Sequence, residues 1–318
     1  MSRSNVRRYL IPVAAVVLLL LGGLVAPGPA SAEDGPPAGR AVRDAWQSAQ
    51  AAGGYRFATE VVQTTFPALA VANVGRSPTE ETIYLEGQVD LPARSMEMAL
   101  WQGSGGVANP GSGIELRVDG DRGYGRQPGG TWQEVDDVSW AFAPGSDHLA
   151  YLAGAENVRS LGMETRLVEA TGSRGGSSSP TDPAIYRFTR YGFDLDGLAF
   201  AQHLRDQLES YLRQRGELPL GLTLDSSRVY QQTTGEGELW VDERGLPLRL
   251  IMHLSYPEEE HGERIEADIT TDFFAFPEGL AAGSSGSWLP AALRPLKEGL
   301  PPTAGEVRTA FTRLGFLA

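Results

Sequence analysis

The stretch LPLRLIMHLSYPEEEHGERIEADITTDFF, residues 246–274, decides the expected fold, because apolar and polar side chains alternate on either side of an acidic loop. The apolar row before the loop consists of Leu246, Leu248, Leu250, Met252, Leu254 and Tyr256, and the row after it consists of Ile265, Ala267, Ile269, Thr271 and Phe273. A period of two places alternate side chains on opposite faces of a strand. The pattern predicts an antiparallel hairpin with one apolar and one solvated face.

Composition excludes several classes of protein. The 318 residues are 41% hydrophobic, which is enough for a sizeable core. The formal net charge of -13 argues against a nucleic-acid partner, because phosphate binding needs a clustered basic surface. The sequence contains no cysteine, which excludes disulfides, thiolate metal sites and a cysteine nucleophile.

The first 32 residues have the pattern of an export signal. Arg3, Arg7 and Arg8 precede an apolar run at 9–26. Ala-Ser-Ala at 30–32 has the small residues of a signal-peptide cleavage site. We expect cleavage after this site and export to the periplasm or the extracellular face of the cell envelope. An uncleaved membrane anchor is the alternative, although a proline and two glycines interrupt the apolar run.

The rest of the chain divides into a spacer, one domain and a tail. Residues 33–39 are a polar, Pro/Gly-rich linker, and residues 40–277 form the expected domain. Within the domain, the Gly/Ser/Pro-rich segment 171–183 predicts a flexible insertion. Residues 278–318 are a Pro/Gly-rich tail that ends in a candidate short helix.

Strand patterns dominate the domain, so we expect an α+β fold. Alternating apolar segments near residues 55–61, 83–91, 96–100 and 114–124 are separated by turn residues and predict a meandering antiparallel sheet. Helical spacing predicts helices over residues 40–52, 145–158 and 196–215. The last has an apolar stripe, which should lie against the sheet. Its members are Phe200, Leu204, Leu208 and Leu212.

The residues of common catalytic and metal sites do not form motifs. The four histidines, at 148, 203, 253 and 261, are dispersed, and neither H-E-x-x-H nor G-x-S-x-G occurs. We therefore assign no catalytic residue, metal ligand or cofactor and predict a non-enzymatic protein. A hydrolase with a dispersed Ser/His/Asp set stays open as an alternative.

The order of these segments resembles the bacterial LolA-like family, which includes LppX-like and LprG-like proteins. The resemblance covers residues 40–277. It is carried by YRFATEVVQ at 55–63, VDGDRGYGRQPGGTWQEV at 118–135, YRFT at 186–189, LAFAQHLRDQL at 198–208, GELWVDERGLPLRL at 237–250 and ITTDFFAF at 269–276. The lipidated cysteine of the LppX-like and LprG-like members is missing.

This resemblance implies a strongly curved antiparallel β half-barrel with helices on its concave side. The half-barrel would enclose an apolar cavity for the acyl chains of a lipid or an acylated lipoprotein, without a cofactor. An envelope protein-interaction or stress-sensor module of the same fold, similar to RseB, is the alternative. Contact with a membrane would be transient or would run through an uncleaved N-terminal segment.

The resemblance also implies which apolar positions would line the cavity, since an acyl chain binds through buried apolar area alone. Methionines suit a deformable wall. For each position, the alternative is an ordinary place in a packed core. The expected wall residues are Phe57, Val61, Leu85, Val89, Met96, Met98, Leu100, Leu116, Leu204, Leu208, Leu248, Leu250, Met252, Ile265 and Ile269.

Overall fold

The computed structural model describes residues 37–104, 107–108, 113–120, 122–135, 147–168, 184–258 and 262–276. The expected signal peptide, the insertion at 171–183 and the tail at 278–318 lie outside these residues. None of the helices within these ranges is long and apolar enough to cross a membrane.

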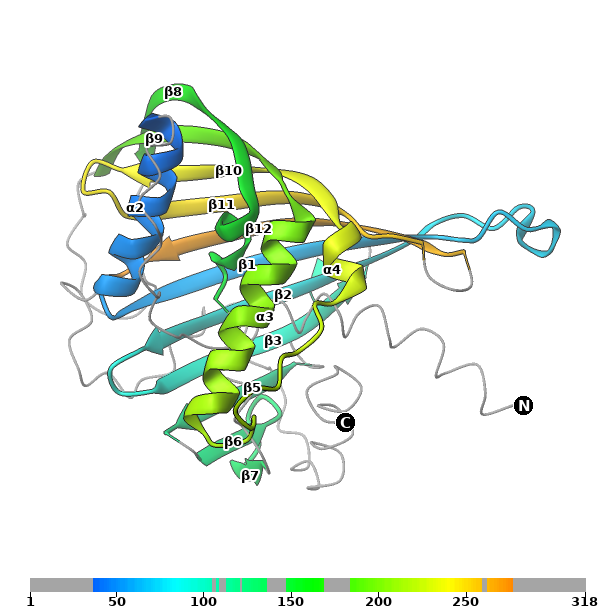
Figure 1. Cartoon of the computed structure of the whole chain (residues 1–318), viewed down its shortest axis with the longest axis horizontal. Helices are drawn as coiled ribbons and strands as arrows, with labels where there is room; N and C mark the ends of the chain where they lie inside the picture. Colours follow the sequence, from blue (N-terminus) through cyan, green and yellow to red (C-terminus); the bar gives the residue numbers. More distant parts are fainter. Residues whose placement is uncertain are drawn as a thin grey trace.

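The described chain forms one large antiparallel sheet with few helices (Figure 1). Its strands are β1 (Gly54–Phe66), β2 (Thr79–Asp90), β3 (Ser95–Ser104), β4 (Val107–Ala108), β5 (Ile114–Asp119), β6 (Arg122–Arg126), β7 (Gln133–Val135), β8 (Ala155–Val168), β9 (Ala184–Leu195), β10 (Thr234–Asp242), β11 (Pro247–Ser255) and β12 (Arg264–Phe274). They are ordered β7-β6-β5-β3-β2-β1-β12-β11-β10-β9-β8, and β4 pairs with β3.

The predicted meander is confirmed, and the stretch that opened the sequence analysis forms β11 and β12. Leu254 pairs with Ala267 and Met252 with Ile269, so both apolar rows share one face of the sheet. Sequence neighbours are also sheet neighbours along most of the order. The break is at the centre, where β1 pairs with β12 and brings the two ends of the domain together. The sheet curls, and no described ladder joins β7 to β8 (Figure 1).

The apolar face of the sheet carries one continuous core that extends from β5 to β9. Burial follows the alternation closely in β12, where every second residue from Ile265 to Phe273 is buried. The core residues of the strands include Tyr55, Phe57, Val61, Ile83, Leu85, Val89, Met96, Met98, Leu100, Ile114, Leu116, Val118, Phe193, Leu195, Leu239, Val241, Leu250, Met252, Leu254, Ile265, Ala267, Ile269 and Phe273. We call this side of the sheet the inner face.

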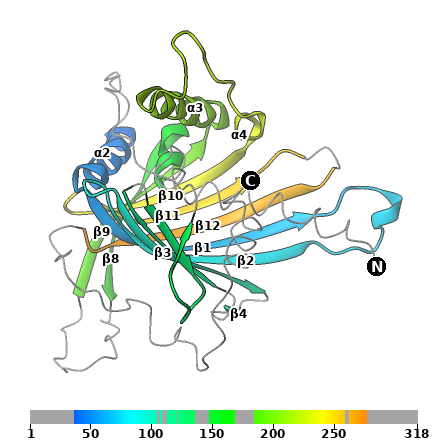
Figure 2. The same cartoon turned by 90° about the horizontal axis from the view of Figure 1, so that it is seen from below.

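The α-helices lie on one side of the sheet (Figure 2). The first, α2 (Pro37–Ala51), contacts β1, β8, β10 and β11, and it begins inside the segment expected to be spacer. Helix α3 (Gly197–Gln214) begins where predicted, because the Asp196 side chain accepts hydrogen bonds from the amides of Leu198 and Ala199. Gly216, with φ of 72°, follows its end. Helix α4 (Arg228–Gln232) was not expected.

The prediction of a helix over residues 145–158 is wrong over most of that segment. The structure has a 3-10 helix, η5 (Ala150–Gly154), and then strand β8. Glycine is required at 154, where the chain leaves this short helix, because a Cβ atom there would lie 2.6 Å from the carbonyl oxygen of Asp196. The chain continues in extended form, and Ala155 pairs with Leu195 of β9.

Gly87 is a close-contact position in the core and provides a test of the packing. It pairs with Phe57, and a Cβ atom there would lie 2.5 Å from Cζ of that ring and 2.8 Å from the carbonyl oxygen of Glu97. We expect Gly87→Ala to lower the free energy of unfolding by about 1–3 kcal/mol in urea titrations, because a tightly packed core resists added volume. Gly39→Ala, in helix α2 with no close contact, should not be destabilising.

Candidate functional site

The inner face gathers most of the expected wall residues. Buried in its core are Phe57, Val61, Leu85, Val89, Met96, Met98, Leu100, Leu116, Leu250, Met252, Ile265 and Ile269. Leu204 is half-buried and packs against them. The alternation therefore identified the correct face of each strand. Burial by itself is equally consistent with a packed core and with a ligand-lined wall.

Leu248 departs from the expected row because of a β-bulge. Trp240 pairs with Arg249, whereas the next residue, Val241, pairs with Pro247, so Leu248 is skipped between them. A bulge places two residues opposite one and shifts the alternation. Pro247 is buried instead, and Leu248 is half-buried outside the core cluster.

The apolar stripe of α3 is covered at its first turn and uncovered at its third. Phe200 is 1% exposed and stacks on Tyr151 of η5 with ring centroids 5.0 Å apart. Leu204, one turn later, is half-buried, and Leu208 is 36% exposed. The helix makes its main contacts with η5 and α4. We expected the whole stripe to pack against the sheet. Only Phe200 is fully buried, and Leu204 and Leu208 are progressively more exposed.

The opposite side of α3 holds the loop that follows the helix. Glu209 is 6% exposed, accepts a hydrogen bond of 2.7 Å from the amide of Leu224 and pairs with Arg213 at 2.5 Å. The hydrogen bond from that amide is the main reason why the pKa of Glu209 is lowered. These contacts hold the loop that follows the helix against α3 at Glu209.

The inner face also contains buried polar atoms at the end of the sheet near the β1–β2 loop. Gln63 and Glu81 are paired across β1 and β2. Gln63 Oε1 and Glu81 Oε2 are buried without a hydrogen-bond partner in the described structure. Burial raises the pKa of Glu81. The alternation in YRFATEVVQ places Gln63 on the apolar face, but neither residue was selected from the sequence.

Asp147 and His148 lie beneath α2, at the other end of β1. Asp147 Oδ2 accepts hydrogen bonds from Trp46 Nε1 at 2.6 Å and from Gln50 Nε2 at 3.2 Å, so this buried carboxyl ties α2 to η5. His148 packs against Phe57 with ring centroids 4.2 Å apart. Both of its ring nitrogens are buried without a described partner. Desolvation lowers the pKa of His148 to about 4.

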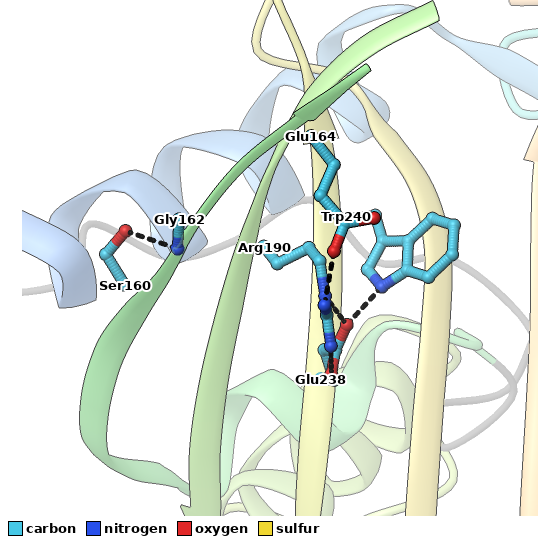
Figure 3. Close-up of polar contacts among 6 residues, drawn as sticks. All are labelled: Ser160, Gly162, Glu164, Arg190, Glu238 and Trp240. Atoms are coloured by element: carbon cyan, nitrogen blue, oxygen red, sulfur yellow. Dashed lines mark hydrogen bonds and ion pairs between the residues drawn. The ribbon is translucent and has the colours of Figure 1, made fainter. Parts of the chain in front are cut away.

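The outer face of the sheet carries a charge cluster, which Figure 3 shows. Arg190 donates to Glu164 at 2.5 Å and to Glu238 at 2.8 Å, and Trp240 Nε1 also donates to Glu238. Hydrogen bonds to the two carboxylates raise the pKa of Arg190. Because one guanidinium on β9 bridges carboxylates on both neighbouring strands, β8 and β10, we interpret the cluster as an ion network that holds these strands together. Ser160 lies apart from it and accepts from the amide of Gly162 at 3.4 Å (Figure 3).

The dispersed histidines do not converge with other ligands. His253 bonds to Asp268 across β11 and β12, and His203 packs on Trp46. Within the described ranges, no group of three His, Asp or Glu side chains is arranged to hold a metal ion. His261 lies outside these ranges.

Comparison with known proteins gives no family. No family model and no curated protein matches the sequence. Among solved structures, a beta-barrel-like protein of a domain of unknown function, DUF1849, from Brucella abortus aligns with 70% of this chain and 98% of its own. The sequence identity is 7% and the TM-score 0.24. Membership of the LolA-like family stays a prediction.

The buried His148 predicts a loss of stability in acid. Its pKa is about 4 in the folded protein against an ordinary 6.5, so the unfolded chain binds more protons between these values. Its contribution is fully present above pH 6.5. We expect about 3 kcal/mol to be lost as the pH falls to 4, partly offset by Asp147, whose pKa burial raises.

Urea titrations from pH 4 to 8 test this expectation. The variant His148→Leu should flatten the acid side of the stability profile. His253→Gln is the matched control: the bond to Asp268 raises the pKa of His253, so this histidine stabilises below pH 6.5 and loses its contribution as the pH rises through the raised pKa. An acid slope unchanged by His148→Leu would contradict the assignment.

Proposed function

We propose that the protein is a non-enzymatic, exported carrier that holds the acyl chain of a lipid or acylated lipoprotein between the inner face of the sheet and α3. In this proposal the curled sheet is a half-barrel, and the helices close its concave side. The observation that carries the proposal is the apolar stripe of α3, which faces away from water at Phe200 and is left exposed at Leu208.

Two properties of the inner face support an acyl ligand. Apolar residues of eight strands, from β5 to β9, belong to one core cluster on the side of the sheet where α3 lies. An acyl chain along Leu204 and Leu208 would extend this surface, and burial of each methylene contributes roughly 0.8 kcal/mol. No directional polar contact is needed for that part of the ligand.

The polar end of the ligand would lie near Gln63 and Glu81. Gln63 Oε1 and Glu81 Oε2 both accept hydrogen bonds, and both are buried without a described partner. These two acceptors suit a hydroxyl group of the ligand, which donates a hydrogen bond. A carboxylate or phosphate would instead face a carboxyl group that burial already disfavours in its charged form.

The second candidate function is an envelope protein-interaction module. Strand β8, at the edge of the sheet, is the observation that favours it. It extends from Ala155 to Val168, and among described strands it pairs only with β9. Met163 of this strand is 70% exposed. A long edge strand can add a strand from another protein. Capture of a defined envelope protein that persists after lipid extraction would favour this function over lipid carriage.

The first test is native mass spectrometry of the mature protein purified from a bacterial periplasm, followed by organic extraction and lipid identification. We expect a near-stoichiometric acyl species. Delipidated protein should then take up a fluorescent acylglycerol analogue. Protein without lipid that also fails to take up the analogue would contradict the proposal.

The matched test within α3 compares two exposed leucines. Leu208→Glu should reduce uptake of the analogue at least about tenfold, because a charge replaces apolar surface along the chain. Leu198→Glu lies on the same helix, 49% exposed and off the stripe, and should take up the analogue as wild type does. Both should keep the wild-type urea midpoint. Equal uptake by the two variants would place the ligand elsewhere or exclude it.

A further inference from the structure

The loop between β1 and β2 projects beyond the end of the sheet (Figures 1 and 2). The last ladder pairs before it are Thr65 with Thr79 and Phe66 with Arg264. Three large apolar side chains beyond these pairs have little contact with the rest of the protein. Their exposed fractions are 104% for Leu69, 92% for Val71 and 82% for Val74. We call these three residues the apolar tip.

Hydrogen bonds within the loop hold its backbone in a defined shape. Asn73 Nδ2 donates to the carbonyl oxygen of Ala68 at 2.9 Å, and the Asn73 amide donates to Ala70 at 2.9 Å. A 3-10 turn spans Val71–Asn73, and the amide of Arg76 donates to Asn73 at 3.0 Å. The loop therefore pairs several of its polar backbone groups locally, while its apolar side chains remain in water. Their exposure to water costs free energy, which burial against a binding partner would recover.

The charge distribution around the tip is unusual for this acidic protein. Residues 61–75 contain no Asp, Glu, Lys, Arg or His, although the whole chain has a net charge of -13. Two arginines lie close behind the tip. Arg76 is exposed, and Arg264 stacks over the ring of Phe66 at 4.4 Å. Acidic residues lie nearby as well: Glu263 precedes Arg264 in the sequence, and Glu266 pairs with Arg264 at 3.3 Å.

We propose that the apolar tip inserts into the boundary between the headgroups and acyl chains of a lipid bilayer. Leu69, Val71 and Val74 would enter the apolar layer, and Arg76 and Arg264 would remain at the level of the headgroups. A tip of three side chains offers much less than the roughly 800 Å² per partner of a stable protein interface, whereas a bilayer needs no complementary surface. A second copy of this acidic chain would be repelled.

This geometry determines the character of the binding. Three side chains bury less apolar surface than a lipid anchor, so attachment is weak and reversible. The acidic residues behind the tip make zwitterionic membranes better targets than anionic ones, and added salt reduces the difference. The proposal extends beyond acyl-chain carriage, because the tip can engage a bilayer whether or not the inner face holds a ligand.

The cysteine-free sequence allows a site-specific test in the full chain. Val71→Cys is labelled with an environment-sensitive fluorophore and mixed with phosphatidylcholine vesicles. We expect a blue shift and protection from an aqueous quencher, with weaker binding when phosphatidylglycerol is added at low salt. Leu220→Cys is the matched control, because Leu220 is 96% exposed in the loop after α3 and should show neither effect.

A second comparison tests whether the apolar side chains of the tip, rather than the attached fluorophore, cause binding to the vesicles. Leu69→Ser with Val74→Ser, in the labelled Val71→Cys background, should reduce partition into vesicles at least about tenfold and leave acylglycerol uptake unchanged. No vesicle response at position 71, an equal response at position 220, or unchanged partition of the serine variant would each overturn the proposal. A response to lipid-free envelope protein without a response to vesicles would also overturn it, in favour of a protein partner.

Discussion

The ladder between β1 and β12 is the interaction on which the rest of the structure depends. It joins two meanders, β1 to β7 and β8 to β12, that share no other described strand pair. The ladder runs from Arg56 paired with Phe274 to Phe66 paired with Arg264, and the hydroxyls of Thr59 and Thr271 meet inside it at 3.0 Å. Contacts so distant in sequence close a long loop, which favours slow folding. Neither half can bury its inner face without the other.

Much of this fold could be predicted from the sequence, because strand alternation and helix termini are local signals. The rows of β11 and β12 were correct, and Asp196 and Gly216 marked the ends of α3. Strand β8 was missed because two irregularities, between Glu156 and Arg159 and between Ser160 and Gly162, interrupt its alternation. The pairing of β1 with β12 has no local signal at all.

The candidate site was less predictable for a related physical reason. Alternation indicates which face of a strand is apolar, but it does not reveal what lies against that face. The bulge after Trp240, which displaces Leu248, and the exposure of Leu208 arise from tertiary packing. Sequence reasoning also concentrated on apolar residues. It therefore overlooked Gln63 and Glu81, and it considered His148 only as a metal ligand; these are polar groups that distinguish this interior from a plain core.

The unequal anchoring of α3 has a mechanical consequence. The helix is fixed at Phe200 by the rings of Tyr151 and Tyr230, whereas burial decreases toward Leu208. Its 18 residues span about 27 Å, so a small tilt about the Phe200 end is magnified at the far end. The helix is therefore held most firmly by the aromatic cluster at Phe200, and farther along Glu209 attaches it to the loop at Leu224. Amide protons of its last turns should exchange with solvent without any opening of the sheet beneath.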